Sequence, residues 1–261
     1  MSSPATAQEY PAAYSQINYT VQGREVRLPF EVRDATAAIA FYLVSAKAAQ
    51  ALIATSGLQV ASVAPGRTIC TIGALHYKDG EIGAYQEIAI TFFVHEKGSR
   101  SLPYLGSAID LLRSKLSAYV HRLPVDNGLS CEVGQTIWGL PKIVADIEIA
   151  SHGDLQTSVL KVDGQHVLTQ SMRMSGNRST GYRNQISYAA RNGMLHRSPS
   201  VMNGAQVGFR LGGATLELGM HHIADELRSL GLPMRPLFTT YIGKMTGFFY
   251  PATKTIIVDS P

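Results

Sequence analysis

The chain has 261 residues, of which 45% are hydrophobic and 16% are charged, and its formal net charge at pH 7 is +4. This composition excludes a largely disordered protein, and the length allows one large domain or two small ones with a substantial core. The two cysteines, Cys70 and Cys131, form neither a disulfide framework nor a metal-binding spacing.

The N-terminal residues 1–15 are small and polar and lack the apolar segment of a secretory signal. Since the chain has no apolar run of 18 residues, we expect no transmembrane helix and no membrane partner. The default expectation is therefore a cytoplasmic protein. We expect residues 1–17 to form a flexible arm and residues 18–261 a single domain.

Residues 164–216 contain no acidic side chain but several arginines, namely Arg173, Arg178, Arg183, Arg191, Arg197 and Arg210. One interpretation is a surface or pocket that favours anions. The other is a set of scattered, solvated arginines. The second is favoured because the stretch lacks lysine clusters and interleaved aromatic repeats, so we expect no nucleic-acid partner.

Short apolar runs between turn signals predict a strand-rich fold. The clearest strands are residues 86–94 and 142–149, and Asp163-Gly164 predicts a hairpin within residues 158–174. Further strands are expected at residues 67–77, 116–123, 205–218 and 253–258.

The two clearest strands alternate, which assigns their faces. In residues 86–94, one face carries Glu87, Ala89, Thr91 and Phe93. In residues 142–149, an apolar face carries Ile143, Ala145, Ile147 and Ile149, and the opposite face carries Lys142, Val144, Asp146 and Glu148.

Helices are few, and we expect them at residues 45–54, capped by Ser45, at 104–116, and at 224–230, ended by Gly231 and Pro233. Three short helices beside about ten strands predict an α+β, β-rich domain. Closure of the sheet would remove the exposed edges of so many strands. The expected architecture is therefore a closed antiparallel β-barrel with a few short helices.

Lys142 stands out because Pro141 stiffens the chain before it and its sequence neighbours are apolar. Burial favours the neutral amine of a lysine over the ammonium, and a neutral amine can attack a ketone to form an imine. The alternative is a solvated lysine on a half-buried strand. Asp146 and Glu148, on the same predicted face, support that alternative.

A longer pattern surrounds this lysine. It consists of Tyr119-Val120-His121, Asp126-Asn127, Val133-Gly134-Gln135-Thr136 and Pro141-Lys142. It resembles the core signature of the acetoacetate decarboxylase family, in which Tyr-x-His is followed by Asp-Asn, Val-Gly-Arg-Glu and Pro-Lys-Lys. The resemblance extends over about residues 20–250. It implies the family's barrel fold, a Schiff base on Lys142, a homo-oligomer, and no need for a metal or organic cofactor.

A second match lies upstream, where Tyr85-Gln86-Glu87 resembles the family's Tyr-Thr-Glu. The resemblance implies that Glu87 lies in the active site. Its predicted face also carries the small Ala89 and Thr91, as expected for a carboxylate that lines a narrow lumen. The alternative is a solvated glutamate at the start of a strand.

The chain also departs from the family pattern. Ile143 replaces the family's second lysine, Gln135-Thr136 replaces its Arg-Glu, and Thr71 lies near the position of a second glutamate. The family's active-site arginine fits Arg33 by its distance to the following strand and Arg24 by its Arg-Glu context. We take Arg33 as the predicted substrate-binding residue.

Two further features leave alternatives open. Trp138, the only tryptophan, either walls the pocket or belongs to the core, and we include it among the predicted substrate-binding residues. His221, His222, Asp225 and Glu226 lie close enough in sequence to bind a metal, but a helix cap or solvated helix face is favoured, so no metal is expected.

The sequence thus predicts a lysine Schiff-base lyase that decarboxylates a small β-keto acid, acetoacetate-like, with a small oxo acid as its partner. One alternative is a Schiff-base aldolase or dehydratase that acts on a larger oxo acid. The other is a non-catalytic barrel that binds an apolar ligand, which Thr71 and Thr136 motivate because they replace acids of the family pattern.

Overall fold

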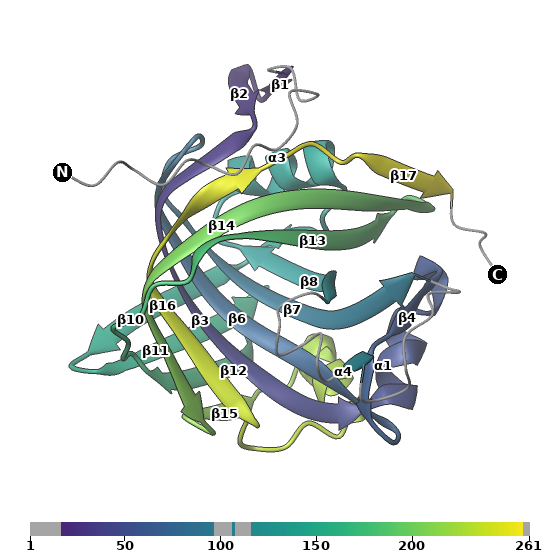
Figure 1. Ribbon diagram of the computed structural model, residues 1–261, viewed down its shortest axis with the longest axis vertical. Coiled ribbons are helices and arrows are strands. Elements are labelled where there is room, and N and C mark those ends of the chain that lie inside the picture. Colours follow the sequence, from purple (N-terminus) through teal and green to yellow (C-terminus); the bar gives the residue numbers. More distant parts are fainter. Residues whose placement is uncertain (1–16, 97–105, 108–115, 258–261) are drawn as a thin grey trace.

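A closed ring of strands forms the centre of the protein in the computed structural model, which describes residues 17–96, 106–107 and 116–257 (Figure 1). The ring runs in the order β7–β6–β3–β16–β14–β13–β8, and β8 pairs with β7 to close it. Its strands are β3 (Phe30–Ser45), β6 (Arg67–Gly80), β7 (Tyr85–Glu96), β8 (Ser117–Val125), β13 (Gly181–Arg191), β14 (Met194–Leu211) and β16 (Phe238–Phe249). All neighbours are antiparallel except β13 and β8.

The remaining strands extend the ring or cover it. A separate four-stranded antiparallel sheet has the order β10–β11–β12–β15. Its strands are β10 (Asp146–His152), β11 (Leu155–Val162), β12 (Gln165–Arg173) and β15 (Ala214–Leu218). The others are β1 (Ile17–Val21), β2 (Arg24–Leu28), β4 (Leu58–Val60), β5 (Ser62–Ala64), β9 (Lys142–Val144) and β17 (Lys254–Ile257).

The four-stranded sheet identifies the outer face of the barrel. Gln170 of β12 accepts a hydrogen bond from the hydroxyl of Tyr42 on β3 and donates one to the carbonyl oxygen of Ile72 on β6, each at 3.4 Å. A second sheet packed this closely cannot lie inside a ring of seven strands, whose interior holds only side chains. Tyr42 therefore points outward, and its neighbours Phe41 and Leu43 point inward.

The ring register extends this assignment to the other strands. The outer face carries Ile72, Ile88, Ile90 and Phe92, which pack into one core with the four-stranded sheet. The inner face carries Phe41, Thr71, Gly73, Glu87, Ala89, Thr91 and Phe93. The face predicted for Glu87, Ala89, Thr91 and Phe93 is thus the inside of the barrel.

The described residues contain three α-helices: α1 (Ala46–Leu52), α3 (Gly128–Trp138) and α4 (His222–Ser229). Ser45 caps α1 as predicted, because its Oγ accepts a hydrogen bond from the Ala48 N–H. The predicted helix at 224–230 begins two residues earlier, at His222. Most of the predicted helix at 104–116 lies outside the described residues. Within that range, the described residues Gly106 and Ser107 are helical.

Sequence reasoning missed α3. Its N-cap is Asn127, whose side chain accepts a hydrogen bond of 2.7 Å from the Ser130 N–H, and it ends at Gly139 with φ of 62°. Figure 1 shows α3 at the end of the barrel next to β1 and β2, with α1 and α4 at the opposite end. Val133 and Ile137 of α3 pack into a second core with inner-face residues from several barrel strands.

Two predicted strands are each divided in the structure. The strand predicted at 205–218 breaks at Gly212-Gly213, where φ is 62° and 83°, so β14 belongs to the barrel and β15 to the outer sheet. The strand predicted at 142–149 breaks at Ala145, which separates β9 from β10. The prediction of one continuous pattern of faces across 142–149 was therefore wrong.

The other strand predictions agree with the structure, and so does the fold class. The predicted strands at 86–94 and 67–77 lie in β7 and β6. The predicted strand at 116–123 lies in β8 from residue 117 on, and β17 covers residues 254–257 of the predicted strand at 253–258. The hairpin turn has Asp163 and Gly164 at φ of 50° and 74°, as an Asp-Gly turn requires. The β-rich closed barrel with short helices is confirmed, although one of its junctions is parallel.

Among the described residues, none of the helices has the length and apolar character needed to span a bilayer. The predicted N-terminal arm lies outside the described residues, apart from Ile17.

Candidate active site

Lys142 is buried, with 5% of its surface exposed. It begins β9, which runs parallel to β8 and places Lys142 opposite Leu123. Because the chain breaks at Ala145, Asp146 and Glu148 belong to the outer sheet, where both are exposed. The two acids that supported a solvated Lys142 therefore lie in another sheet.

The amine of Lys142 has two close polar partners. Its Nζ lies 2.9 Å from Oε2 of Glu87 and donates a hydrogen bond of 3.0 Å to Oγ of Ser130. It also lies 5.0 Å from the centroid of the Tyr85 ring. Glu87 and Ser130 are 6% and 0% exposed, so the amine, the carboxylate and the hydroxyl form one enclosed cluster. The structure thus brings the two predicted catalytic residues together.

The distance within this pair sets what it can do chemically. At 2.9 Å a proton can pass directly between Nζ of Lys142 and the carboxylate of Glu87.

Two tyrosines extend the cluster. The rings of Tyr77 and Tyr85 stack with centroids 4.3 Å apart, and the Tyr85 hydroxyl hydrogen-bonds with Tyr77 and Ser130. Burial, followed by the charge of Glu87 and other nearby groups, raises the pKa of both phenols well above the usual range. Both tyrosines therefore stay protonated and offer neutral hydroxyls beside the lysine.

Helix α3 fixes the path of the lysine side chain. A Cβ at Gly134 would lie 2.6 Å from Cδ and 2.7 Å from Cε of Lys142, so only glycine leaves room for the lysine to pass. Gln135 lies one residue further along and donates a hydrogen bond of 2.7 Å to the carbonyl oxygen of Lys142. The two consecutive residues hold the side chain and the backbone of Lys142 respectively.

Trp138 lies at the end of α3 and is 7% exposed. Its ring packs edge-on against Phe30 and Phe249, and its Nε1 donates a hydrogen bond of 2.7 Å to the carbonyl oxygen of Tyr250. These contacts assign Trp138 to the core that anchors α3 to the barrel.

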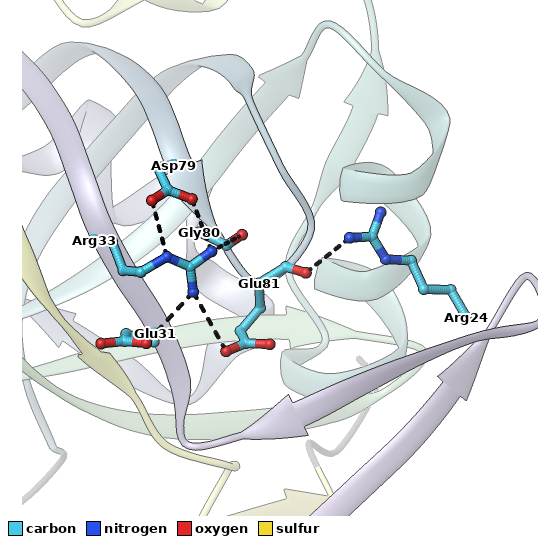
Figure 2. Close-up of polar contacts among 6 residues, drawn as sticks. All are labelled: Arg24, Glu31, Arg33, Asp79, Gly80 and Glu81. Atoms are coloured by element: carbon cyan, nitrogen blue, oxygen red, sulfur yellow. Dashed lines mark hydrogen bonds and ion pairs between the residues drawn. The ribbon is translucent and has the colours of Figure 1, made fainter.

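Arg33 lies in an exposed cluster of acids, shown in Figure 2. It donates hydrogen bonds to both carboxylate oxygens of Asp79 and to the carbonyl oxygen of Gly80, and it also pairs with Glu31 and Glu81. Asp79 raises the pKa of the guanidinium and has its own pKa lowered in return. The structure does not bring Arg33 into contact with Lys142 or Glu87, and its charge is already compensated.

The other candidate residues have structural partners. Thr71, near the family's second glutamate, shares a hydrogen bond of 2.6 Å with Thr91 on the inner face of the barrel. His221 caps α4 through its Nδ1, as the helix-cap interpretation expected. Glu226 binds His121 and Arg122 on β8. Within the described ranges, no group of His, Cys, Asp or Glu is arranged to hold a metal ion.

Three of the arginines of residues 164–216 have separate partners rather than a shared one. Arg173 pairs with Asp154, Arg197 donates to Thr253, and Arg210 donates to Ser175.

Sequence reasoning missed Ser130 and the role of Gly134. Both lie on α3, and the only available signal was the cap Asn127 followed after α3 by Gly139, a pairing that marks the two ends of a helix. With that helix in place, its i, i+4 spacing would have put Ser130 and Gly134 on one face.

Comparisons with known proteins bear on the family and the fold of the chain. The sequence model of the family described as acetoacetate decarboxylase matches residues 15–248. No curated protein sequence matches the chain.

Solved structures resemble the fold at low sequence identity. A solved structure of acetoacetate decarboxylase has a TM-score of 0.61 and 14% identity, and the match covers 88% of this chain and 89% of that chain. Acetoacetate decarboxylase from Legionella pneumophila has a TM-score of 0.60, 15% identity and 87% coverage of both chains. The enduracididine biosynthesis enzyme MppR, complexed with pyruvate, has a TM-score of 0.52, 13% identity and coverage of 87% and 90%.

Proposed function

We propose that this chain, which belongs to the acetoacetate decarboxylase family, is a lysine Schiff-base lyase that decarboxylates a β-keto acid. The observation that carries the proposal is the buried amine of Lys142, 2.9 Å from the Glu87 carboxylate. The family membership supplies the class of chemistry. The geometry supplies a nucleophile and an adjacent base in a site sheltered from water.

Imine formation requires two proton transfers to the substrate oxygen. Glu87 accepts a proton from the Lys142 ammonium, and the freed amine attacks the ketone carbon to give an alkoxide with a protonated nitrogen. One proton passes from that nitrogen to the oxygen, which gives the neutral carbinolamine. Glu87 then returns its proton to the carbinolamine hydroxyl, which leaves as water, so that a protonated imine forms and the carboxylate is restored.

The protonated imine then acts as the electron sink. The bond between the α-carbon and the carboxylate breaks, carbon dioxide leaves, and the electron pair forms an enamine. Protonation of the enamine carbon and hydrolysis of the imine release the ketone and regenerate Lys142. Ser130 holds the amine in position through its 3.0 Å hydrogen bond while the nitrogen changes charge.

A second candidate function uses the same imine for aldol condensation or dehydration of a larger oxo acid. The hydrogen-bonded Thr71–Thr91 pair favours it, because the family resemblance expects a carboxylate near Thr71. The similarity to MppR, whose structure contains pyruvate, points in the same direction at the level of the fold.

Product analysis separates these candidates. Acetoacetate incubated with the protein should give carbon dioxide and acetone faster than the spontaneous background, and Lys142→Ala should abolish the excess. Lys161→Ala, an exposed lysine on β11, is the control and should remain active. If acetoacetate is inert but pyruvate and an aldehyde are condensed, the second candidate is correct. If neither substrate is converted and no ketone reacts with Lys142, but an apolar ligand binds tightly, the protein is a non-catalytic carrier.

Cytoplasmic location and homo-oligomeric assembly remain part of the proposal. The assembly rests on the family resemblance, and light scattering of the purified chain tests it. A monomeric mass would contradict that part alone.

A further inference from the structure

The inner wall of the barrel leads away from the Lys142–Glu87 pair along β7. Ala89, Thr91 and Phe93 follow Glu87 on this face, and all three are only half-buried. Their outer-face neighbours Ile90 and Phe92 are 1% and 0% exposed. The accessible surface of this part of β7 is therefore on the inside, where a bound molecule can reach it.

The middle of this wall carries small, uncharged groups. Gly73 pairs with Ala89, and Thr71 pairs with Thr91, whose hydroxyl it binds. A Cβ at Gly73 would lie 3.5 Å from Leu75, 3.6 Å from Ile39 and 4.0 Å from Ala89. These are ordinary contacts, so an alanine fits at position 73, while a longer side chain would extend across the wall.

Aromatic rings line the far end of the wall. Phe41 stacks with Phe238 at 4.2 Å between centroids and with Phe93 at 6.3 Å, and Phe209 lies 5.0 Å from Phe238. These rings come from four strands of the barrel, and Phe209 is 61% exposed. The four rings form an apolar surface, which we call the aromatic end.

The distance between the lysine and the aromatic end suits one kind of molecule. Thr91, at the level of Phe41 in the strand register, follows Glu87 by four residues, which spans about 13 Å along a strand. Acetoacetate is too short to span this gap. A ketone with a medium-length alkyl or arylalkyl tail would reach the rings while its carbonyl carbon stays at Lys142.

We propose that the inner wall binds the apolar tail of the substrate, so that the substrate is a ketone or β-keto acid with an extended aliphatic or aryl chain. This inference rests on the proposed function, because it places the carbonyl carbon at Lys142. The tail lies along Ala89 and Gly73 and ends against Phe41 and Phe93. Desolvation of the tail and the wall supplies the added affinity.

The test uses the unmodified protein first. Borohydride trapping is run over a range of concentrations with acetone, methyl butyl ketone, methyl nonyl ketone and benzylacetone, and the half-saturating concentration is read from the adduct yield. We expect that concentration to fall by up to about fourfold for each methylene that becomes buried. Equal values for all four ketones would overturn the proposal.

A larger side chain at Gly73 locates the tail. Gly73→Leu should weaken binding of methyl nonyl ketone at least tenfold and binding of acetone by a much smaller factor, whereas Leu155→Ala, at an exposed position on β11, should change neither. An equal loss for acetone and the long ketone would place the tail elsewhere and contradict the assignment. If Gly73→Leu fails to fold, the chain-length series on the unmodified protein still decides.

The outcomes also separate this inference from the function on which it rests. If acetone forms an adduct but the half-saturating concentration does not fall with chain length, the tail site is overturned and the Schiff-base role of Lys142 still holds. No adduct with any ketone overturns both.

Discussion

At the scale of single residues, the site depends on an enclosed pair of opposite charges. Lys142 and Glu87 are far apart in sequence, and each is at least 94% buried. Removal of one member of such a pair costs about 3–5 kcal/mol when the other stays charged. Because Glu87 is also the proposed base beside the amine, a change at this position affects catalysis as well as stability.

We expect Glu87→Gln to slow imine formation by about 100-fold, because a general base beside the amine is lost while the side-chain shape is kept. The measurement is the rate of borohydride-trapped adduct with a ketone at saturation. Glu148→Gln removes an exposed carboxylate from β10 and should leave the rate unchanged. A Glu87→Gln rate within threefold of the unmodified protein would exclude Glu87 from the proton transfer.

The sequence located this pair only through the family resemblance. Taken alone, the pattern favoured a solvated Lys142, because Asp146 and Glu148 fall on its predicted face and a break at Ala145 cannot be recognised from alternation. Arg33 was selected by its spacing from a strand, but spacing cannot show that Asp79, from the neighbouring strand β6, will bind its guanidinium. Ser130 and Gly134 could not be proposed because the helix that carries them was not predicted.

At the scale of elements, α3 determines the path of the Lys142 side chain and also buries it. In a helix interior, replacement of glycine by alanine normally stabilises by about 1 kcal/mol. At Gly134 the added methyl group would overlap the Lys142 side chain. At this position, helix propensity therefore favours alanine, whereas the packing of Lys142 requires glycine.

We predict that Gly134→Ala displaces the Lys142 amine and lowers the trapping rate at least tenfold, although the variant stays folded by circular dichroism. Gly128→Ala, in the first turn of the same helix with open space around it, is the matched control and should keep the rate. Equal rates in both variants would show that α3 does not position the lysine.

A second element, α4, is attached to the barrel by charge. Burial would raise the pKa of Glu226, but hydrogen bonds from His121 and Arg122 outweigh it and lower the pKa to about 2 from its usual 4.5. A carboxylate with a lowered pKa stabilises the folded state above its unfolded pKa, and this stabilisation is lost as the pH falls toward the folded value.

We therefore expect Glu226→Gln to be less stable than the unmodified protein at pH 6, with the difference shrinking between about pH 4.5 and pH 2. Urea unfolding across this pH range measures it. A difference in unfolding free energy that stays constant with pH would mean that the charge of Glu226 does not hold α4.

At the scale of the whole molecule, the barrel and the outer sheet share one core. Leu168 of the outer sheet and Ile90 of the barrel both lie in it, at 0% and 1% exposure. The strand-rich class and most strands could be predicted because alternation and turn residues are local signals. The division of 205–218 between two sheets could not, since it depends on which strands meet across the fold.

Leu168→Ala tests whether the two parts unfold together, as the proposed single domain requires. The cavity should cost about 2–5 kcal/mol. Trp138, the only tryptophan, reports on the α3 end of the barrel. The unfolding midpoint measured by its fluorescence should therefore shift together with the midpoint measured by circular dichroism. Leu155→Ala, an exposed position on β11, should change neither. A fluorescence midpoint that stays in place would reveal two independent units.

One measurement reaches the central claim directly, namely that the amine at position 142 bonds to a carbonyl carbon. The protein is incubated with acetoacetate and borohydride and then digested, and the masses of the peptides are measured by mass spectrometry. We predict that the peptide containing Lys142 gains the mass of one reduced ketone and that the Lys142→Arg variant gains none. An unmodified Lys142 peptide, or an adduct spread over exposed lysines such as Lys161, would contradict the account.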